Sequence, residues 1–201
     1  MGLRRFPRVG CLSSPMSFVL GGRPVRPIAF LALLAVVVFP ALGATIHVPG
    51  DQPTIQLGIQ AAAPGDTVLV ACGTYFEHDL EVAPGICLRG ETGEPQCVTI
   101  DARGAGRVLR CSQGGPDTRI EGFTLTGGSL SNDYGGGIYC RDASPTISRC
   151  IVTGNLGYSG GSCIYCLRSN PVISECRIEA NLRSIDGGGL YCTLSSPTLS
   201  Y

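Results

Sequence analysis

The strongest constraint on the fold of this chain is a sequence repeat of 26 residues in its last third. The segment GGGIYCRDASPTISRC (135–150) returns as GSCIYCLRSNPVISEC (161–176), and a third copy, GGGLYCTLSSPTLS, begins at Gly187. A fixed period of this size is typical of solenoids, arrays and propellers. The positions that keep the step without a gap are Ile138, Ile164 and Leu190; Tyr139, Tyr165 and Tyr191; Cys140, Cys166 and Cys192; Pro145, Pro171 and Pro197; Cys150 and Cys176; and Asn155 and Asn181.

The pattern inside each unit predicts short β-strands and no helix. Glycine triplets and a Ser-Pro or Asn-Pro step interrupt the units, so no run of ten residues at helical spacing fits. In CIVTGN (150–155) and CRIEAN (176–181), alternate residues are apolar while those between them vary freely. That period of two is typical of strands with one buried face. An earlier copy, IEGFTLTGG (120–128), fits the same frame.

Strands that recur at a fixed step predict an all-β fold, a right-handed parallel β-helix. Each strand then pairs in register with its equivalent one turn later, about 4.8 Å away. Identical side chains stack in ladders, and each turn buries its apolar face against its neighbours. We place the rungs at residues 67–201, with regular repeats from about residue 135. Because the third copy is unfinished at Tyr201, we expect the chain to be a truncated piece of a longer protein.

A strand and a short helix are predicted ahead of the rungs, at residues 45–66. In the stretch QPTIQLGIQAAAPGD, Pro53 suits the first helical position, and Ile55 and Ile59 share one face. Gly58 is expected to weaken this helix. A helix here would cap the first rung and protect its edge from pairing with another chain.

The first part of the chain, residues 1–44, has the features of a signal peptide. Arg23 and Arg26 precede an apolar core, IAFLALLAVVVF (28–39), and the small residues ALGA follow it. Twelve apolar residues are too few to span a bilayer. We therefore expect cleavage, no membrane span in the mature chain, and a secreted, extracellular or cell-surface location. Met16 is an alternative start, and an uncleaved anchor is the alternative to cleavage.

The segment TIHVPGDQPTIQLGIQAAAPGDTVLVACGTYFE (45–77) resembles the first turn of pectin-lyase-like right-handed β-helix proteins. The GGGIYC…SPTI…C…N units resemble the repeats of bacterial secreted and surface members of that superfamily, which also includes pectin methylesterases and pectate lyases. The resemblance covers residues 45–201 and implies the fold. It implies no single activity, because the superfamily hosts several chemistries. Members often carry an asparagine ladder at one turn, a role that the resemblance gives to Asn155 and Asn181.

The sequence assigns no catalytic residue. The superfamily's esterases use paired aspartates with an arginine and glutamines, whereas Asp133, Asp142 and Asp186 do not recur in the repeat frame. The Trp-x-Asp-His signature of its pectate lyases is impossible without tryptophan. His47 and His78 have no Ser or Cys partner in a recognisable motif. The motifs therefore favour a protein that is not an enzyme and has no cofactor, while leaving enzymatic activity open.

The cysteines of the repeats are expected to point inward. Cys140, Cys166 and Cys192 should form one stack, and Cys150 and Cys176 another. The rung spacing falls inside the Cα range of a disulfide, and export permits oxidation. Free cysteine also packs as a small apolar residue, so bridging and simple packing remain two alternatives. The stretch CIYC has no second pair or nearby histidine, so no metal site is predicted.

The repeated tyrosine should face outward, because its two neighbours face inward. In the earlier stretch VLRC, an arginine takes its place. The column expected on one outer sheet is therefore Arg110, Tyr139, Tyr165 and Tyr191. Stacked phenol rings form a flat amphipathic strip that suits the faces of sugar rings. The alternative is that aromatic residues in register only stabilise the sheet.

Charge and motifs together favour one class of function. After residue 44 the chain carries 15 acidic residues against ten arginines, which argues against nucleic-acid binding. We expect a non-catalytic secreted or cell-surface protein that binds polysaccharide or mediates adhesion. One alternative is a polysaccharide lyase, glycoside hydrolase or pectinesterase-like enzyme whose catalytic residues are unassigned or lie beyond residue 201. The other is a structural spacer, and the oligomeric state is not predicted.

Overall fold

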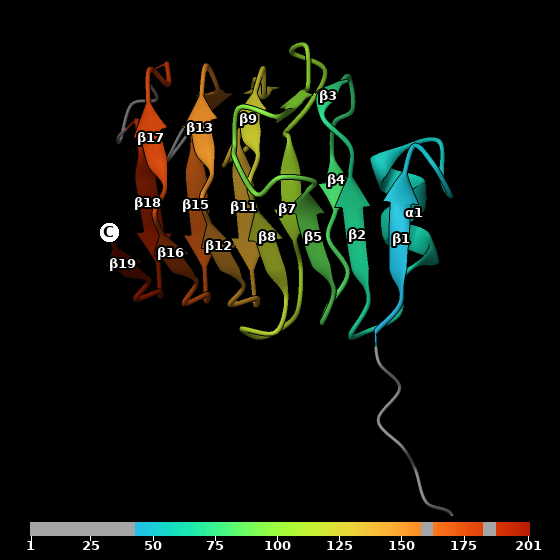
Figure 1. The fold of residues 1–201 in the computed structure, drawn as a ribbon. Coiled ribbons are helices and arrows are strands. Elements are labelled where there is room, and N and C mark those ends of the chain that lie inside the picture. Colours follow the sequence, from blue (N-terminus) through green and yellow to red (C-terminus); the bar gives the residue numbers. More distant parts are fainter. Residues whose placement is uncertain (1–42, 158–162, 183–187) are drawn as a thin grey trace, which may run out of the picture. The chain divides into compact units, whose positions relative to one another are not determined.

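Parallel strands from successive turns of the chain stack into three sheets that wind about one axis (Figure 1). This computed structural model describes residues 43–157, 163–182 and 188–201. The predicted signal peptide, apart from its last two residues, lies outside these ranges, as does Asp186. The fold is a right-handed β-solenoid of about six turns, so the predicted fold class is confirmed.

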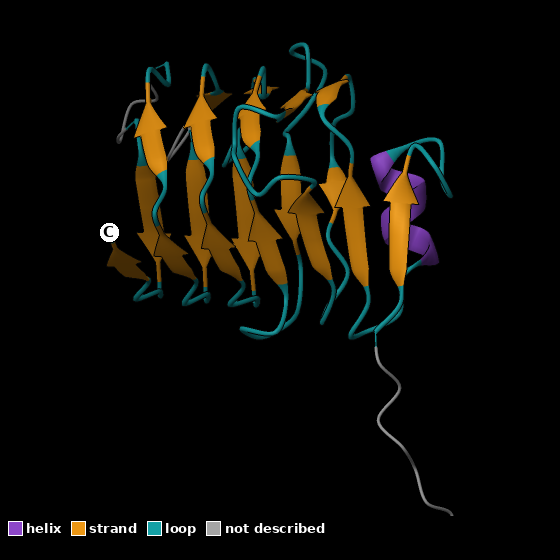
Figure 2. Ribbon diagram, viewed as in Figure 1, coloured by secondary structure: helices purple, strands orange, loops and turns teal. Residues whose placement is uncertain are grey.

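Each turn from β2 to β18 contributes one strand to each sheet, while β1 and β19 extend the first sheet at its two ends; the strands are orange in Figure 2. The first sheet contains β1 (Thr45–Val48), β2 (Thr67–Val70), β5 (Cys87–Gly90), β8 (Arg119–Glu121), β12 (Thr146–Ser148), β16 (Val172–Ser174) and β19 (Thr198–Ser200). The second sheet contains β3 (Gly73–Tyr75), β6 (Val98–Asp101), β9 (Thr124–Thr126), β13 (Ile151–Thr153) and β17 (Arg177–Glu179). The third sheet contains β4 (Leu80–Glu81), β7 (Leu109–Cys111), β11 (Ile138–Arg141), β15 (Ile164–Leu167) and β18 (Leu190–Thr193). A short pair, β10 (Ser129–Leu130) and β14 (Leu156–Gly157), completes the strands of the described residues.

The register of the strands follows the sequence repeat. Tyr139 pairs with Tyr165, which pairs with Tyr191, and Ile147 pairs with Ile173. The inward residues of the middle turns are fully buried and apolar, as Phe123, Ile120 and Ile147 illustrate. Full burial of such a side chain stabilises the folded state by about 1.5–3 kcal/mol. The core is therefore a set of apolar ladders shared between adjacent turns.

The helix α1 (Ile55–Ala61) lies against the first turn. The Thr54 hydroxyl accepts a hydrogen bond from the Leu57 amide at 3.2 Å, so Thr54 is the N-cap. The Glu77 carboxylate accepts further bonds from the Ile55 and Gln56 amides, at 2.8 and 3.0 Å. The expectation that Pro53 begins the helix is wrong, because it precedes the cap. This seven-residue helix is too short to cross a membrane, and it is the only helix of the described part of the chain.

Gly58 has a packing role in α1. A Cβ atom at this position would lie 2.9 Å from a methyl group of Val48 and 2.9 Å from one of Val68. Both valines are buried in β1 and β2. The glycine lets the helix approach the sheet closely, so it is needed for packing although it costs helix propensity.

We predict that Gly58→Ala destabilises the protein by about 1–2 kcal/mol in denaturant unfolding, because overpacking outweighs the gain in helix propensity. Gln60→Ala is the matched control, since Gln60 is exposed on the same helix. The control should change the free energy of unfolding by less than about 0.5 kcal/mol. A Gly58→Ala protein as stable as the wild type would contradict this packing role.

Asn155 satisfies the backbone at the turn after β13. Its side chain is fully buried, and its amide nitrogen donates to the carbonyls of Leu125 and Thr153 at 3.0 and 3.1 Å. Its side-chain oxygen accepts from the Gly128 amide at 2.9 Å. Asn181, one turn on, accepts from the Asn155 side chain at 3.2 Å. The two asparagines thus join three turns with hydrogen bonds that the local backbone cannot make by itself.

Asn155→Ala should lower the free energy of unfolding by about 2–4 kcal/mol, because it leaves buried backbone groups without partners. The comparison is Asn170→Ala, which removes one exposed acceptor from the Ser196 amide. That variant should lose less than about 1 kcal/mol. Equal losses, measured by thermal or denaturant unfolding, would argue against a special role for Asn155.

Candidate functional site

One column of outward side chains on the third sheet is called the outer strip. It consists of Glu81, Arg110, Tyr139, Tyr165 and Tyr191, each paired in register with the next. The four residues expected from the sequence therefore lie on consecutive strands. Glu81 was missed because β4 has only two residues and lies outside the regular repeat.

The three strip tyrosines stack on one another. The ring centroids of Tyr139 and Tyr165 are 5.5 Å apart with 6° between the ring planes, and those of Tyr165 and Tyr191 are 5.7 Å apart at 9°. These distances exceed the strand spacing of about 4.8 Å, so the rings are offset, as stacked aromatic pairs prefer. The Tyr165 hydroxyl lies 3.2 Å from that of Thr193.

The loop between β10 and β11 covers the middle of the outer strip. Tyr134 from this loop stacks on Tyr165 with centroids 4.5 Å apart. Gly135 follows with φ of +65°, where a Cβ would lie 3.1 Å from that of Tyr165. As a result Tyr165 is only 5% exposed, whereas Tyr134 is 37% exposed. The expectation of an open column is therefore wrong at Tyr165, and the accessible ring at this point is Tyr134.

A buried arginine ties this loop to the strip. Arg107 is 6% exposed, and its guanidinium carbon lies 4.5 Å from the centroid of the Tyr139 ring. It donates to the Tyr134 carbonyl at 3.2 Å and to the Asp133 carboxylate. Its Nε also lies 3.5 Å from a carboxylate oxygen of Asp79. Because two carboxylates and a ring face surround this cation, it fixes the loop over the tyrosines.

No pattern in the sequence indicates this arrangement around Arg107. Asp133 was noted but had no visible partner, because Arg107 and Asp79 lie in turns that do not keep the 26-residue step. His78 was also noted without a partner, and its Nδ1 lies 3.0 Å from Asp79. Contacts between irregular turns depend on how those turns stack in three dimensions, so they cannot be predicted from a sequence pattern.

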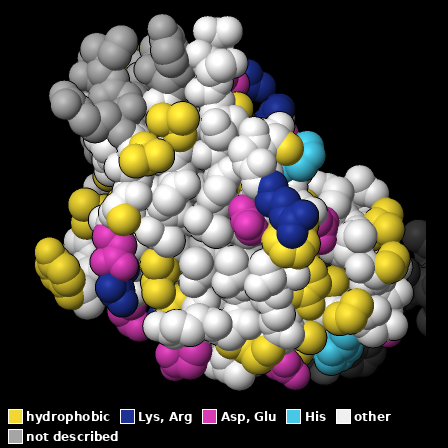
Figure 3. All heavy atoms as spheres, turned by 90° about the horizontal axis from the view of Figure 1, so that it is seen from above, with side chains coloured by type: hydrophobic (Ala, Val, Ile, Leu, Met, Phe, Trp, Pro, Cys, Tyr) yellow, Lys and Arg dark blue, Asp and Glu magenta, His cyan; other side chains and the backbone are white. Residues whose placement is uncertain are grey.

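The other charges of the strip are also paired. Arg110 Nε lies 2.8 Å from the Glu81 carboxylate and 2.9 Å from the Ser112 hydroxyl. The Ser112 amide in turn donates to Glu81 at 3.1 Å. On the upper face of the β-helix, Figure 3 likewise shows a few acidic and basic side chains scattered among hydrophobic and uncharged ones. The strip thus offers paired charges and ring faces instead of a field of one sign.

A pocket of about 440 Å³ adjoins the first end of the outer strip, between α1 and the turns beside β4 and β7. Its size falls in the range of small-ligand sites. Glu81 lines it and is also the first residue of the strip. The other polar side chains of its wall are Gln56, Gln60, Ser112 and Gln113. Amide and hydroxyl groups therefore line the pocket around one carboxylate that is already paired.

A protein-family model described as a right handed beta helix region matches residues 80–200. The chain belongs to this β-helix family. Searches of curated proteins and of solved structures found no match. The family membership therefore rests on the turns from β4 onward, which include the whole outer strip.

Asp142 and His47, the two remaining residues considered for catalysis, lie apart from the strip charges. The Arg168 guanidinium pairs with both carboxylate oxygens of Asp142, at 2.6 and 2.7 Å, and lowers the pKa of that carboxyl. Asp142 has a φ of +52° and is exposed in a turn of the β-helix. His47 is in β1, the edge strand at the N-terminal end of the first sheet. None of these contacts brings a nucleophile and a base together.

The two expected cysteine stacks are present in this β-helix, and one of them has an additional member. Cys111, Cys140, Cys166 and Cys192 stack in register on the third sheet, so this cysteine ladder has four members instead of three. Cys150 and Cys176 follow β12 and β16 and directly precede the in-register pair Ile151 and Arg177, so they lie at equivalent positions of adjacent turns. All six are free thiols in the structure.

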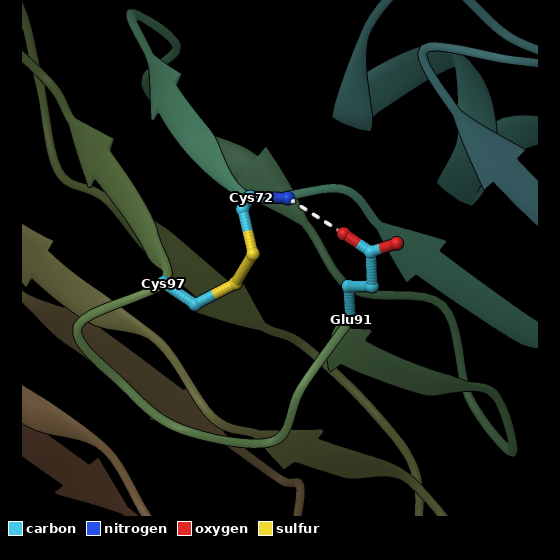
Figure 4. A group of neighbouring side chains, drawn as sticks. All are labelled: Cys72, Glu91 and Cys97. Atoms are coloured by element: carbon cyan, nitrogen blue, oxygen red, sulfur yellow. Dashed lines mark hydrogen bonds between the residues drawn. A yellow bond between two sulfur atoms is a disulfide. The ribbon is translucent and has the colours of Figure 1, made fainter.

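The one disulfide of the described residues joins Cys72 to Cys97 (Figure 4). The Glu91 carboxylate accepts a hydrogen bond from the Cys72 amide at 3.1 Å. These three side chains are close enough together to hold a metal ion if the cysteines were reduced. In the oxidised form both sulfurs are used in the covalent bond, so the group acts as a cross-link between turns.

We predict that Tyr134→Ala exposes Tyr165. Tyrosine nitration with tetranitromethane, mapped by mass spectrometry, should leave Tyr165 unmodified in the wild type and modify it in the variant, because the stacked ring is gone. Tyr201→Ala, which removes a fully exposed tyrosine, should leave Tyr165 protected. Nitration of Tyr165 in the wild-type protein would contradict the cover by Tyr134.

Proposed function

We propose that this β-helix is an exported protein that binds an uncharged polysaccharide along the outer strip and in the adjoining pocket, without cleaving it. The observation that carries the proposal is the exposed Tyr134 ring, held flat by stacking on a column of aromatic rings. An aromatic face fixed in this way binds the C–H face of a sugar at little cost in conformational entropy.

The dimensions of the surface suit a chain instead of a single sugar. From Glu81 to Tyr165 the strip crosses three strand spacings, or about 14 Å. A polysaccharide lying along the solenoid axis would meet the pocket at one end and Tyr134 at the other. The hydroxyl groups of the ligand would pair with Gln60, Gln113 and Ser112, which carry both donors and acceptors.

The charges favour an uncharged ligand. The guanidinium groups of Arg107 and Arg110, beside and within the outer strip, are paired with carboxylates of the protein. Arg141, at the end of β11, is exposed and lies outside the outer strip. The side chains of Asp79 and Asp133 are about half exposed, at 51% and 54%. A uronate chain would bring further carboxylates beside these acidic groups and would have to displace an existing ion pair, which costs binding free energy.

The test is native electrophoresis of the protein through gels cast with uncharged glucans, mannans or xylans, and through gels cast with polygalacturonate or alginate. The protein should be retarded by at least one uncharged glycan and not by the uronates, and later staining should show no cleared zone. Tyr134→Ala should weaken binding about tenfold, which corresponds to about 1.4 kcal/mol, while Tyr201→Ala should not.

The other outcomes would replace this proposal. A cleared zone at the protein band would mean that the protein degrades the glycan and is an enzyme. Retardation by uronates alone would overturn the charge argument. No retardation by any glycan would leave a structural spacer as the better account.

A further inference from the structure

Six free cysteines form two stacks along the solenoid, and four of the six are buried in its core. In the cysteine ladder, Cys140 lies between Cys111 and Cys166, and Cys166 lies next to Cys192. Cys111, Cys140 and Cys166 are fully buried, while Cys192 is exposed. Thiol contacts with Cys111 and Cys166, together with burial, raise the pKa of Cys140. In-register pairing on adjacent parallel strands places these cysteines at equivalent positions of neighbouring turns.

The chain already contains a disulfide of the same kind. Gly73 pairs with Val98 in register, so Cys72 and Cys97 occupy the preceding register step on adjacent parallel strands. Their Cα atoms are 4.7 Å apart. That separation matches the spacing of neighbouring strands and falls in the range that disulfides tolerate. Residues in register on adjacent turns of this solenoid can therefore be bridged.

We propose that the two stacks are sites of disulfide formation, pairing Cys111 with Cys140, Cys166 with Cys192, and Cys150 with Cys176. A four-membered ladder divides into two adjacent pairs with no thiol left over. The alternative pairing of Cys140 with Cys166 would leave two unpaired thiols, one of them in the core. Each bridge would join one turn to the next, as the Cys72–Cys97 bridge does.

The oxidation needs a disulfide donor, such as oxidised glutathione or a protein disulfide. The thiolate of one cysteine attacks a sulfur of the donor, forms a mixed disulfide, and releases one donor thiol. The partner cysteine, as its thiolate, then attacks the mixed disulfide and releases the second donor thiol. Two protein thiols thus become one disulfide, and the donor gains two electrons and two protons as two thiols. Because most of these sulfurs are buried in the folded solenoid, we place the reaction before the turns close.

The test counts free thiols after refolding the protein with a mixture of oxidised and reduced glutathione. Alkylation in denaturant without reductant, followed by peptide mapping, should modify two of the ten cysteines after residue 44, namely Cys87 and Cys163. Modification of all eight cysteines outside the Cys72–Cys97 bridge would overturn the proposal. So would a bridge between Cys140 and Cys166.

A matched pair of variants separates pairing from chance oxidation. Cys150→Ser should release Cys176 as a third alkylated residue. Cys87→Ser should leave the three proposed bridges intact and reduce the number of alkylated residues to one. Recovery of Cys176 in a bridge to any other cysteine in the first variant would count against specific pairing. These readouts do not depend on glycan binding, so they can fail or succeed independently of the proposed function.

Discussion

Pairing of each strand with the equivalent strand one turn later is the interaction on which the rest of this structure depends. It fixes which side chains lie next to one another over the whole solenoid, because a shift of one residue would reverse inward and outward faces. The apolar ladders, the stacked tyrosines, the cysteine ladder and the pair Asn155–Asn181 are all consequences of the same register. The stability of the solenoid is then shared between neighbouring turns and is not concentrated in one centre.

The surface proposed for binding combines this regular register with irregular turns. The repeat supplies the column of rings, and an irregular loop supplies Tyr134, which covers one of them. Arg107 makes this possible, since it holds Asp133, the Tyr134 carbonyl and the Tyr139 ring at once. Within the described ranges, every buried side-chain nitrogen or oxygen has a hydrogen-bond partner. Because the polar groups of this loop are satisfied, the loop holds Tyr134 in a defined position. A ligand then binds with a smaller loss of conformational entropy than it would on a mobile loop.

Much of the fold could be predicted from the sequence, while the cover of the site could not. A period of 26 residues and alternation within each unit were enough for the parallel solenoid and for the outward direction of Tyr139 and its equivalents. Gly58 was judged by helix propensity alone, whereas its packing against β1 and β2 requires knowledge of the partner strands. Likewise Arg107 and Asp79 lie in turns that do not follow the 26-residue repeat. Their contact depends on how turns of unequal length stack on one another.

Nuclear Overhauser effects between backbone protons of paired turns would test the register most directly. On uniformly ¹³C,¹⁵N-labelled protein, the account predicts contacts between residues 26 apart on the third sheet, from Tyr139 to Tyr165 and from Tyr165 to Tyr191. It also predicts contacts between Arg110 and Tyr139, where the step is larger. Contacts in an antiparallel order, or displaced by one residue from these pairs, would contradict the in-register solenoid and every ladder derived from it.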